Sequence, residues 1–288
     1  MATVDLHTHT LRSDGLLRPD ELVRDARAAG VRTLAITDHD TLAAIRDLTA
    51  PGSPPLPAGL EVIAGVEINA VGPGADVGAG EGELHILGYG VDPADDRFEA
   101  TLVAQREGRR RRFDALVARM RDLGLPIDRE VAALEPDDDD ALGRPTIARC
   151  LVTAGHASSV EDAFDRLLSR GRPGYLPRVG LGPVEAIHAI RDAGGLASLA
   201  HFAEAPERLS LLLELQGHGL VGLEVHYRSY DDATIAKLAA TAAELGLVAT
   251  GGTDYHGDDG PYADRLAELR IPDAVGADLL DRIDDHQR

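Results

Sequence analysis

Seven short apolar segments constrain the fold of this 288-residue chain more than any other feature of its sequence. Their apolar and β-branched residues predict strands over 3–7, 33–37, 62–68, 84–87, 196–199, 221–225 and 247–250. Helices are marked between several of them, for example from Pro19 to Gly30 and from Pro183 to Gly194, because proline favours the first turn of a helix and glycine its end. The repeated order of strand, helix and strand predicts a parallel sheet, and seven such units favour a closed barrel over an open sheet.

The alternation of strands and helices stops after the fourth predicted strand. From residue 97 to residue 178 the pattern is helical only, with helices predicted over 98–123, 145–153 and 160–169. The charge changes in the same place: this segment has 15 Arg, no Lys and 14 acidic residues, a net charge of +1, whereas the rest of the chain sums to −21. We therefore expect a barrel domain formed by residues 1–96 and 179–288, with a small helical domain, residues 97–178, inserted into it.

The overall charge and the absence of certain segments limit the partners that we expect. A net charge of −20 repels a long phosphate backbone, so long nucleic acids are not expected to bind. No apolar run approaches the roughly 18 residues of a membrane span. The first residues lack a basic segment followed by an apolar one, and the single cysteine, Cys150, cannot form an internal disulfide, so we expect a cytoplasmic protein. No protein partner can be inferred.

Histidine and acidic residues gather where the predicted strands end. His7 and His9 end the first strand, and side chains two positions apart on a strand share a face. The other members of this set lie in or just after later strands, or in the first loop: Asp14, His39, Glu67, His85, His201, Asp254 and His256. Because the carboxyl ends of parallel strands meet at one rim of a barrel, we expect all nine side chains to surround a single mouth.

Six histidines and three carboxylates exceed the needs of one ion. Imidazole and carboxylate ligands suit Mn, Fe or Zn, and the absence of a thiolate from the set excludes a zinc site of the cysteine type. The number of ligands therefore predicts two or three divalent metal ions.

The same segments resemble the ordered motifs of the PHP (polymerase and histidinol phosphatase) family. The matching segments are His7-Thr8-His9 with Asp14-Gly15, Ile36-Thr37-Asp38-His39-Asp40, Gly65-Val66-Glu67, His85, Leu199-Ala200-His201 and Gly252-Thr253-Asp254-Tyr255-His256. The resemblance implies an α/β fold, a distorted seven-stranded (β/α)7 barrel, with a cluster of usually three divalent metals that hydrolyses phosphoesters.

The resemblance also implies how the ligands are shared among the metals. The first metal would be bound by His7, His9, Glu67 and Asp254. The second would be bound by Glu67, His85 and His201, and the third by Asp14, His39 and His256. Glu67 would then bridge two ions.

Two segments of the predicted insertion are similar to parts of PHP enzymes that act on nucleotides. These segments, 143–149 and 172–178, resemble nucleoside 3′,5′-bisphosphate phosphatases and the related 5′-to-3′ exoribonucleases of short RNAs, which carry a small helical domain inserted in the barrel. We expect Arg144 and Arg178 to bind phosphate, because a planar guanidinium can donate two parallel hydrogen bonds to it. The expected substrate is a small phosphorylated molecule: a nucleoside bisphosphate, a nucleoside monophosphate or the 5′ end of a short RNA.

The expected reaction is hydrolysis by a metal-bound hydroxide, because a divalent cluster acidifies bound water and holds the attacking and leaving oxygens in line. His226, which follows the sixth predicted strand, is expected to face the same rim and to donate a proton to the leaving oxygen or bind the substrate.

Other functions remain open at this point. A histidinol-phosphate phosphatase, or a phosphatase of another small metabolite, would share the metal motifs, and a non-catalytic metal-binding module would keep the ligands. A dinuclear amidohydrolase of the common kind uses a carboxylated lysine at a strand end. The only lysine here, Lys237, falls inside a predicted helix, which disfavours that enzyme class.

Overall fold

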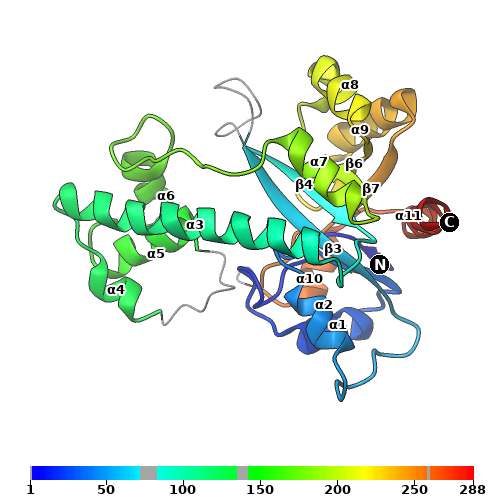
Figure 1. Cartoon of the computed structure of the whole chain (residues 1–288), viewed down its shortest axis with the longest axis horizontal. Coiled ribbons are helices and arrows are strands. Elements are labelled where there is room, and N and C mark those ends of the chain that lie inside the picture. The colour runs from blue at the N-terminus through cyan, green and yellow to red at the C-terminus, as the bar shows by residue number, and fades with distance from the viewer. Residues whose placement is uncertain (1, 72–82, 135–141, 258–259) are drawn as a thin grey trace. The chain divides into compact units, whose positions relative to one another are not determined.

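The computed structural model describes residues 2–71, 83–134, 142–257 and 260–288 (Figure 1). The chain forms two compact units: Met1–Leu102 together with Leu181–Arg288, and Val103–Gly180. Within the described ranges, none of the helices has the length and apolar character needed to cross a membrane.

The first unit is built on a seven-stranded sheet whose strands are neighbours in chain order. The strands are β1 (Val4–Asp5), β2 (Thr33–Ile36), β3 (Glu61–Val71), β4 (Glu83–Tyr89), β5 (Leu196–Leu199), β6 (Leu220–Tyr227) and β7 (Val248–Gly252). The two edges of the sheet meet, because the N–H of Leu6 donates to the carbonyl of Gly251 at 3.0 Å and Thr8 forms a parallel bridge with Tyr255. The predicted seven-stranded α/β barrel is confirmed.

The expectation of an all-parallel sheet is wrong for the fourth strand. The pairs β1–β2, β2–β3, β5–β6 and β6–β7 are parallel, but β4 runs antiparallel to both β3 and β5. Only residues 72–82 join β3 to β4, which suffices for antiparallel neighbours, whereas a parallel crossover needs about a dozen residues or more and usually contains a helix. His85 therefore lies near the amino end of β4 and still reaches the same rim, opposite Asn69 of β3.

Helices accompany the strands of the first unit: α1 (Pro19–Ala28), α2 (Ala43–Thr49), α7 (Pro183–Asp192), η2 (Ala205–Glu207), α8 (Leu209–Gly217), α9 (Asp232–Leu245), α10 (Tyr262–Glu268) and α11 (Ala274–Gln287). The ends of α9 show the local causes. The Asp231 carboxylate accepts a hydrogen bond from the N–H of Thr234 at 2.8 Å, and the helix stops at Gly246, whose φ of 66° suits glycine. Apolar faces of these helices pack on the strands in two buried clusters, which form the barrel core.

The second unit is helical in its described part. The chain enters it within α3 (Asp96–Asp122), and the unit contains α4 (Asp128–Ala132), α5 (Arg144–Thr153), α6 (Val160–Ala163) and the short π-helix η1 (Phe164–Leu168). It has a separate core that includes Phe113, Leu116 and Met120. Two arginines of α3 hold the segment 172–178 against this helix, because the Arg112 guanidinium donates to the carbonyl of Leu176 at 2.8 and 2.9 Å and that of Arg119 donates to the carbonyl of Pro173 at 2.7 Å.

Candidate metal centre

The nine predicted ligands of the first unit do converge, and they form three groups. Within each group, the donor atoms all lie within 4.8 Å of one another. The first group contains His7, His9, Glu67 and Asp254. Nε2 of His7 lies 3.2 Å from Oε2 of Glu67 and 3.3 Å from Oδ1 of Asp254, and Nε2 of His9 lies 3.2 and 3.1 Å from the same two oxygens. Four donor atoms thus surround one position.

Strand geometry explains why both imidazoles of the first group reach that position. His7 and His9 follow β1 directly and are fully buried, whereas Thr8 between them turns to the other side, where its hydroxyl donates to the carbonyl of Ala35 at 2.7 Å. Asp254 follows β7 with an unusual φ of 51°, and its N–H donates to the carbonyl of His7 at 2.8 Å. Strained conformations of this kind often occur at functional sites.

The second group contains Glu67, His85 and His201. Oε1 of Glu67 lies 2.7 Å from Nδ1 of His85 and 3.2 Å from Nε2 of His201, and the two ring nitrogens are 3.1 Å apart. Glu67 therefore presents one carboxylate oxygen to the first group and the other to the second. This arrangement is that of a carboxylate able to bridge two ions.

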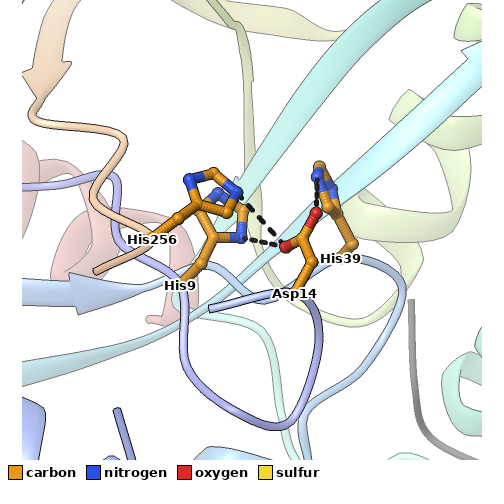
Figure 2. Close-up of side chains that lie close together, drawn as sticks. All are labelled: His9, Asp14, His39 and His256. Atoms are coloured by element: carbon orange, nitrogen blue, oxygen red, sulfur yellow. Dashed lines mark ion pairs between the residues drawn. The ribbon is translucent and has the colours of Figure 1, made fainter. Parts of the chain in front are cut away.

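The third group contains His9, Asp14, His39 and His256, shown in Figure 2. Oδ1 of Asp14 lies 3.2 Å from Nε2 of His256 and 3.7 Å from Nδ1 of His9, while Oδ2 lies 3.6 Å from Nε2 of His39. His9 faces the first group through Nε2 and the third through Nδ1. Because a neutral imidazole has a single lone pair, His9 can ligate in one of the two groups and presents an N–H to the other.

The spacing of the donors fits metal ions. Two donors that each lie about 2.0 to 2.2 Å from one ion are separated by roughly 3.0 to 3.5 Å, which matches the distances in the first group and those from Nε2 of His201 in the second. In addition, neither ring nitrogen of the buried His9 has the geometry of a hydrogen bond to any described residue, although carboxylate oxygens lie at 3.1 and 3.2 Å from Nε2. A lone pair directed at a shared ion would explain why a ring nitrogen of His9 has no hydrogen-bond partner in the described part of the chain. Nitrogen and oxygen donors suit Mn, Fe or Zn.

The charges of the cluster are mutually dependent. Burial acts to raise the pKa of the Glu67 carboxyl, but the neighbouring imidazoles of His39, His7 and His85 outweigh it and hold that pKa well below its usual value. Burial acts to lower the pKa of His7, and the carboxylates of Asp254, Glu224 and Glu67 raise it well above the usual value. The carboxylates therefore require compensating positive charge, which divalent ions would supply.

Comparison with known proteins shows the family to which the chain belongs. The family model of the PHP domain matches residues 5–138. A 3′,5′-nucleoside bisphosphate phosphatase of Chromobacterium violaceum is 32% identical over 264 residues, which cover 89% of this chain and 88% of that protein. The chain belongs to the PHP family. Like its relatives it is a metal-dependent phosphoesterase, and thus a hydrolase.

Two further PHP relatives extend the comparison. The 5′-3′ exoribonuclease Rnm of Escherichia coli is 35% identical over 279 residues, covering 94% of this chain and 90% of the exoribonuclease. A solved structure from Bifidobacterium adolescentis, described as that of a metal-dependent phosphoesterase, has a TM-score of 0.78 and 32% identity and covers 97% of this chain and 96% of its own. The fold and the family are therefore shared over nearly the whole length of each protein.

The structure does not bring His226 together with the three ligand groups of this PHP protein. Nδ1 of His226 lies 2.8 Å from the carbonyl oxygen of Arg270. The register of β6 with β7 shifts between Glu224 and His226, so the strict alternation of faces fails there. Tyr227 faces the cluster instead, with its hydroxyl donating to Oδ2 of Asp254 at 3.0 Å.

Arg144 and Arg178 both belong to the second unit of the PHP protein. The Arg144 guanidinium lies 5.9 Å from the ring centroid of Phe164 and 5.6 Å from that of Tyr175. Burial and the charge of Arg178 lower the pKa of Arg144 to about 10. The repulsion from Arg178 thus adds to the effect of burial, which disfavours the charged form of Arg144.

Sequence reasoning missed three buried carboxylates beside the ligands. Asp5 accepts hydrogen bonds from the N–H and hydroxyl of Thr253 at 2.9 and 2.7 Å, next to Asp254. Asp38 binds the loop that carries Asp14, and Glu224 contacts His7. Each of the three lies in or beside a predicted strand, as the predicted ligands do. Their positions in the sequence therefore give the same signal, and only their contacts in the structure show that they bind the residues around the ligands.

Proposed function

We propose that this PHP protein hydrolyses a phosphate ester of a small nucleotide, namely a nucleoside 3′,5′-bisphosphate, a nucleoside monophosphate or the 5′ end of a short oligoribonucleotide. The observation that carries the proposal is the division of the Glu67 carboxylate between two groups of donors. The two nucleotide-directed relatives support the same substrate class.

The residues of the first unit would bind and orient the metals. Two or three ions of Mn, Fe or Zn are expected, with His7, His9, Glu67 and Asp254 in the first group, His85 and His201 completing the second, and Asp14, His39 and His256 forming the third. When bound, such ions supply an activated water and stabilise the charge that develops on the phosphoryl oxygens. The burial of His7, His9 and Glu67 restricts water on the inner side of the cluster and keeps these side chains in one geometry.

The proposal gives the arginine pair a separate role. Arg144 and Arg178 would bind a phosphate group of the substrate through charge-assisted hydrogen bonds, which are roughly twice as strong as hydrogen bonds between neutral groups. The bound phosphate would offset the repulsion between the two guanidinium groups. The acidic surplus of the remaining chain, −21 outside residues 97–178, favours small anions over long nucleic acids.

We propose that His226 contacts the substrate and does not donate the proton to the leaving oxygen. Its ring contacts the carbonyl of Arg270, and burial lowers its pKa, so it is largely neutral near pH 7. Tyr227, whose hydroxyl donates to Oδ2 of Asp254 at 3.0 Å, lies beside the metal centre instead.

The substrate class is tested on purified protein that has been stripped with a chelator and reloaded with Mn²⁺, Fe²⁺ or Zn²⁺. Adenosine 3′,5′-bisphosphate, AMP, a 5′-phosphorylated trinucleotide and histidinol phosphate are compared by release of phosphate or mononucleotide. An Asp254→Asn variant purified in parallel reports any contaminating phosphatase. We expect at least one nucleotide to exceed histidinol phosphate by tenfold or more in kcat/KM. Preference for histidinol phosphate, or no release from any nucleotide, would refute the nucleotide assignment.

A further inference from the structure

Glu224 is a fully buried carboxylate beside the metal centre that belongs to none of the three ligand groups. It lies on β6. Its Oε1 accepts a hydrogen bond from Nδ1 of His7 at 3.0 Å, and its Oε2 accepts one from the backbone N–H of His201 at 2.6 Å. His7 is a member of the first group and His201 of the second, so one carboxylate contacts a ligand residue of each.

The contact with His7 determines which ring nitrogen faces the first group. A carboxylate beside Nδ1 keeps the proton of a neutral imidazole on that atom. Nε2, which lies 3.2 Å from Oε2 of Glu67 and 3.3 Å from Oδ1 of Asp254, then keeps its lone pair directed at the shared position. The ring is fixed in the tautomer and orientation that a metal ligand needs.

The contact with His201 acts on the backbone instead of the ring. His201 has a φ of 28°, in a region that residues other than glycine rarely adopt. Such a conformation persists only when its surroundings hold it, and the short hydrogen bond from its N–H to a buried carboxylate does so. In this conformation Nε2 of His201 lies 3.2 Å from Oε1 of Glu67.

We propose that Glu224 is a positioning residue that sets the geometry of two adjacent metal groups at once, through the ring of His7 and the backbone of His201. Glutamine is the informative replacement because it has nearly the same shape but only one acceptor oxygen. That oxygen can serve the ring N–H of His7 or the backbone N–H of His201, and the amide NH₂ then opposes the other donor. The substitution therefore loosens at least one of the two groups.

Asp38 provides a matched control, because it is also a buried carboxylate at a strand end but serves a different group. Its Oδ1 accepts from the N–H of Thr10 and the hydroxyl of Ser13, both at 2.7 Å, and its Oδ2 accepts from the hydroxyl of Thr10 at 2.7 Å. These bonds hold the loop that carries Asp14 of the third group. Thr10 directly follows His9, which faces the first and third groups, so an Asp38→Asn change should affect only those two and leave the second group intact.

The test measures metal at each group by anomalous diffraction from Mn²⁺-titrated crystals, and total affinity by equilibrium dialysis with metal analysis. For Glu224→Gln we expect a roughly 10- to 100-fold weaker affinity at the first group, the second group or both, with the third group unchanged. For Asp38→Asn we expect any loss to be confined to the first and third groups, with the second group unchanged. Wild-type affinity at the first two groups in Glu224→Gln, or the same pattern of losses across the three groups in both variants, would overturn the proposal.

A second variant covers the case in which Glu224→Gln does not fold. Glu224→Asp keeps both oxygens but is shorter by one methylene, so it cannot span the two donors, and the same loss at the first or second group is expected. Unchanged affinity at both groups in this variant would also contradict the proposal. The inference rests on metal binding by the two groups and not on the substrate, so a wild-type protein that binds metal but hydrolyses no nucleotide would refute only the proposed substrate.

Discussion

Oε1 of Glu67 lies 2.7 Å from Nδ1 of His85, although the two residues belong to strands that run in opposite directions. The other oxygen of the same carboxylate lies 3.2 Å from Nε2 of His7, which comes from the first strand segment of the chain. The carboxylate of Glu67 thus contacts imidazoles from distant parts of the sequence, one with each oxygen.

This relationship predicts that Glu67 matters to two metal groups and Asp254 to one. Glu67→Gln should lower metal binding at the first and second groups together, whereas Asp254→Asn should lower it at the first group only. Because each metal contributes several kcal/mol to transition-state stabilisation, we expect either change to reduce kcat/KM by roughly 10³-fold or more. Metal content per protein and steady-state kinetics provide the measurement, and circular dichroism should show the fold retained. Unchanged turnover in Asp254→Asn would remove that residue from the catalytic centre.

The arginine pair predicts a defect in substrate binding. Arg144→Ala or Arg178→Ala should remove a charge-assisted interaction worth about 1.5 to 3 kcal/mol and so raise KM by roughly 10- to 100-fold, with a smaller effect on metal content. Arg129→Ala serves as the control, because Arg129 is an exposed residue of α4 in the same unit. If all three variants show the same kinetics as the wild type, Arg144 and Arg178 do not bind the substrate.

Gly252 allows the close approach of β7 to the segment that carries His7. A Cβ added at Gly252 would lie 2.4 Å from both the Cβ and the backbone nitrogen of His7. Gly252→Ala should therefore displace His7, lower the free energy of unfolding by about 1 to 3 kcal/mol and weaken metal binding. Gly217→Ala is the control, since an added Cβ there meets nothing within 4 Å in the described structure, and no loss of stability is expected. Thermal and urea unfolding would measure both. A Gly252→Ala protein as stable as the wild type would show that the strands can separate without cost.

Cys150 should react slowly in the folded protein. The residue is 3% exposed in α5, and burial raises the pKa of its thiol, so little thiolate forms at pH 8. We expect alkylation by iodoacetamide to be at least about tenfold slower in the native protein than in urea, as followed by mass spectrometry. Equal rates in the two conditions would indicate that α5 opens readily.

The seven strands, the helical character of the segment after β4 and the nine converging side chains follow from local pattern. Alternating apolar segments mark strands without reference to the rest of the chain, and His7, Asp254 and their partners stand at segment ends that a barrel brings to one rim. The direction of β4 does not follow from such a pattern, because the spacing of apolar residues over 83–89 is the same whichever way the strand runs relative to its neighbours. Only its pairing with β3 and β5 shows that it is antiparallel.

Local properties of the sequence are enough to predict a barrel with imidazole and carboxylate side chains at its mouth, because residue types and strand-end positions do not depend on the rest of the fold. Long-range packing places Tyr227 and Glu224 toward the cluster and His226 against Arg270, because a register shift in β6 breaks the two-residue period on which the prediction of His226 depended. The tertiary structure also decided that Glu67 divides its two oxygens between two groups. Such a division depends on the positions of side chains from five separate segments, and no local pattern specifies those distances.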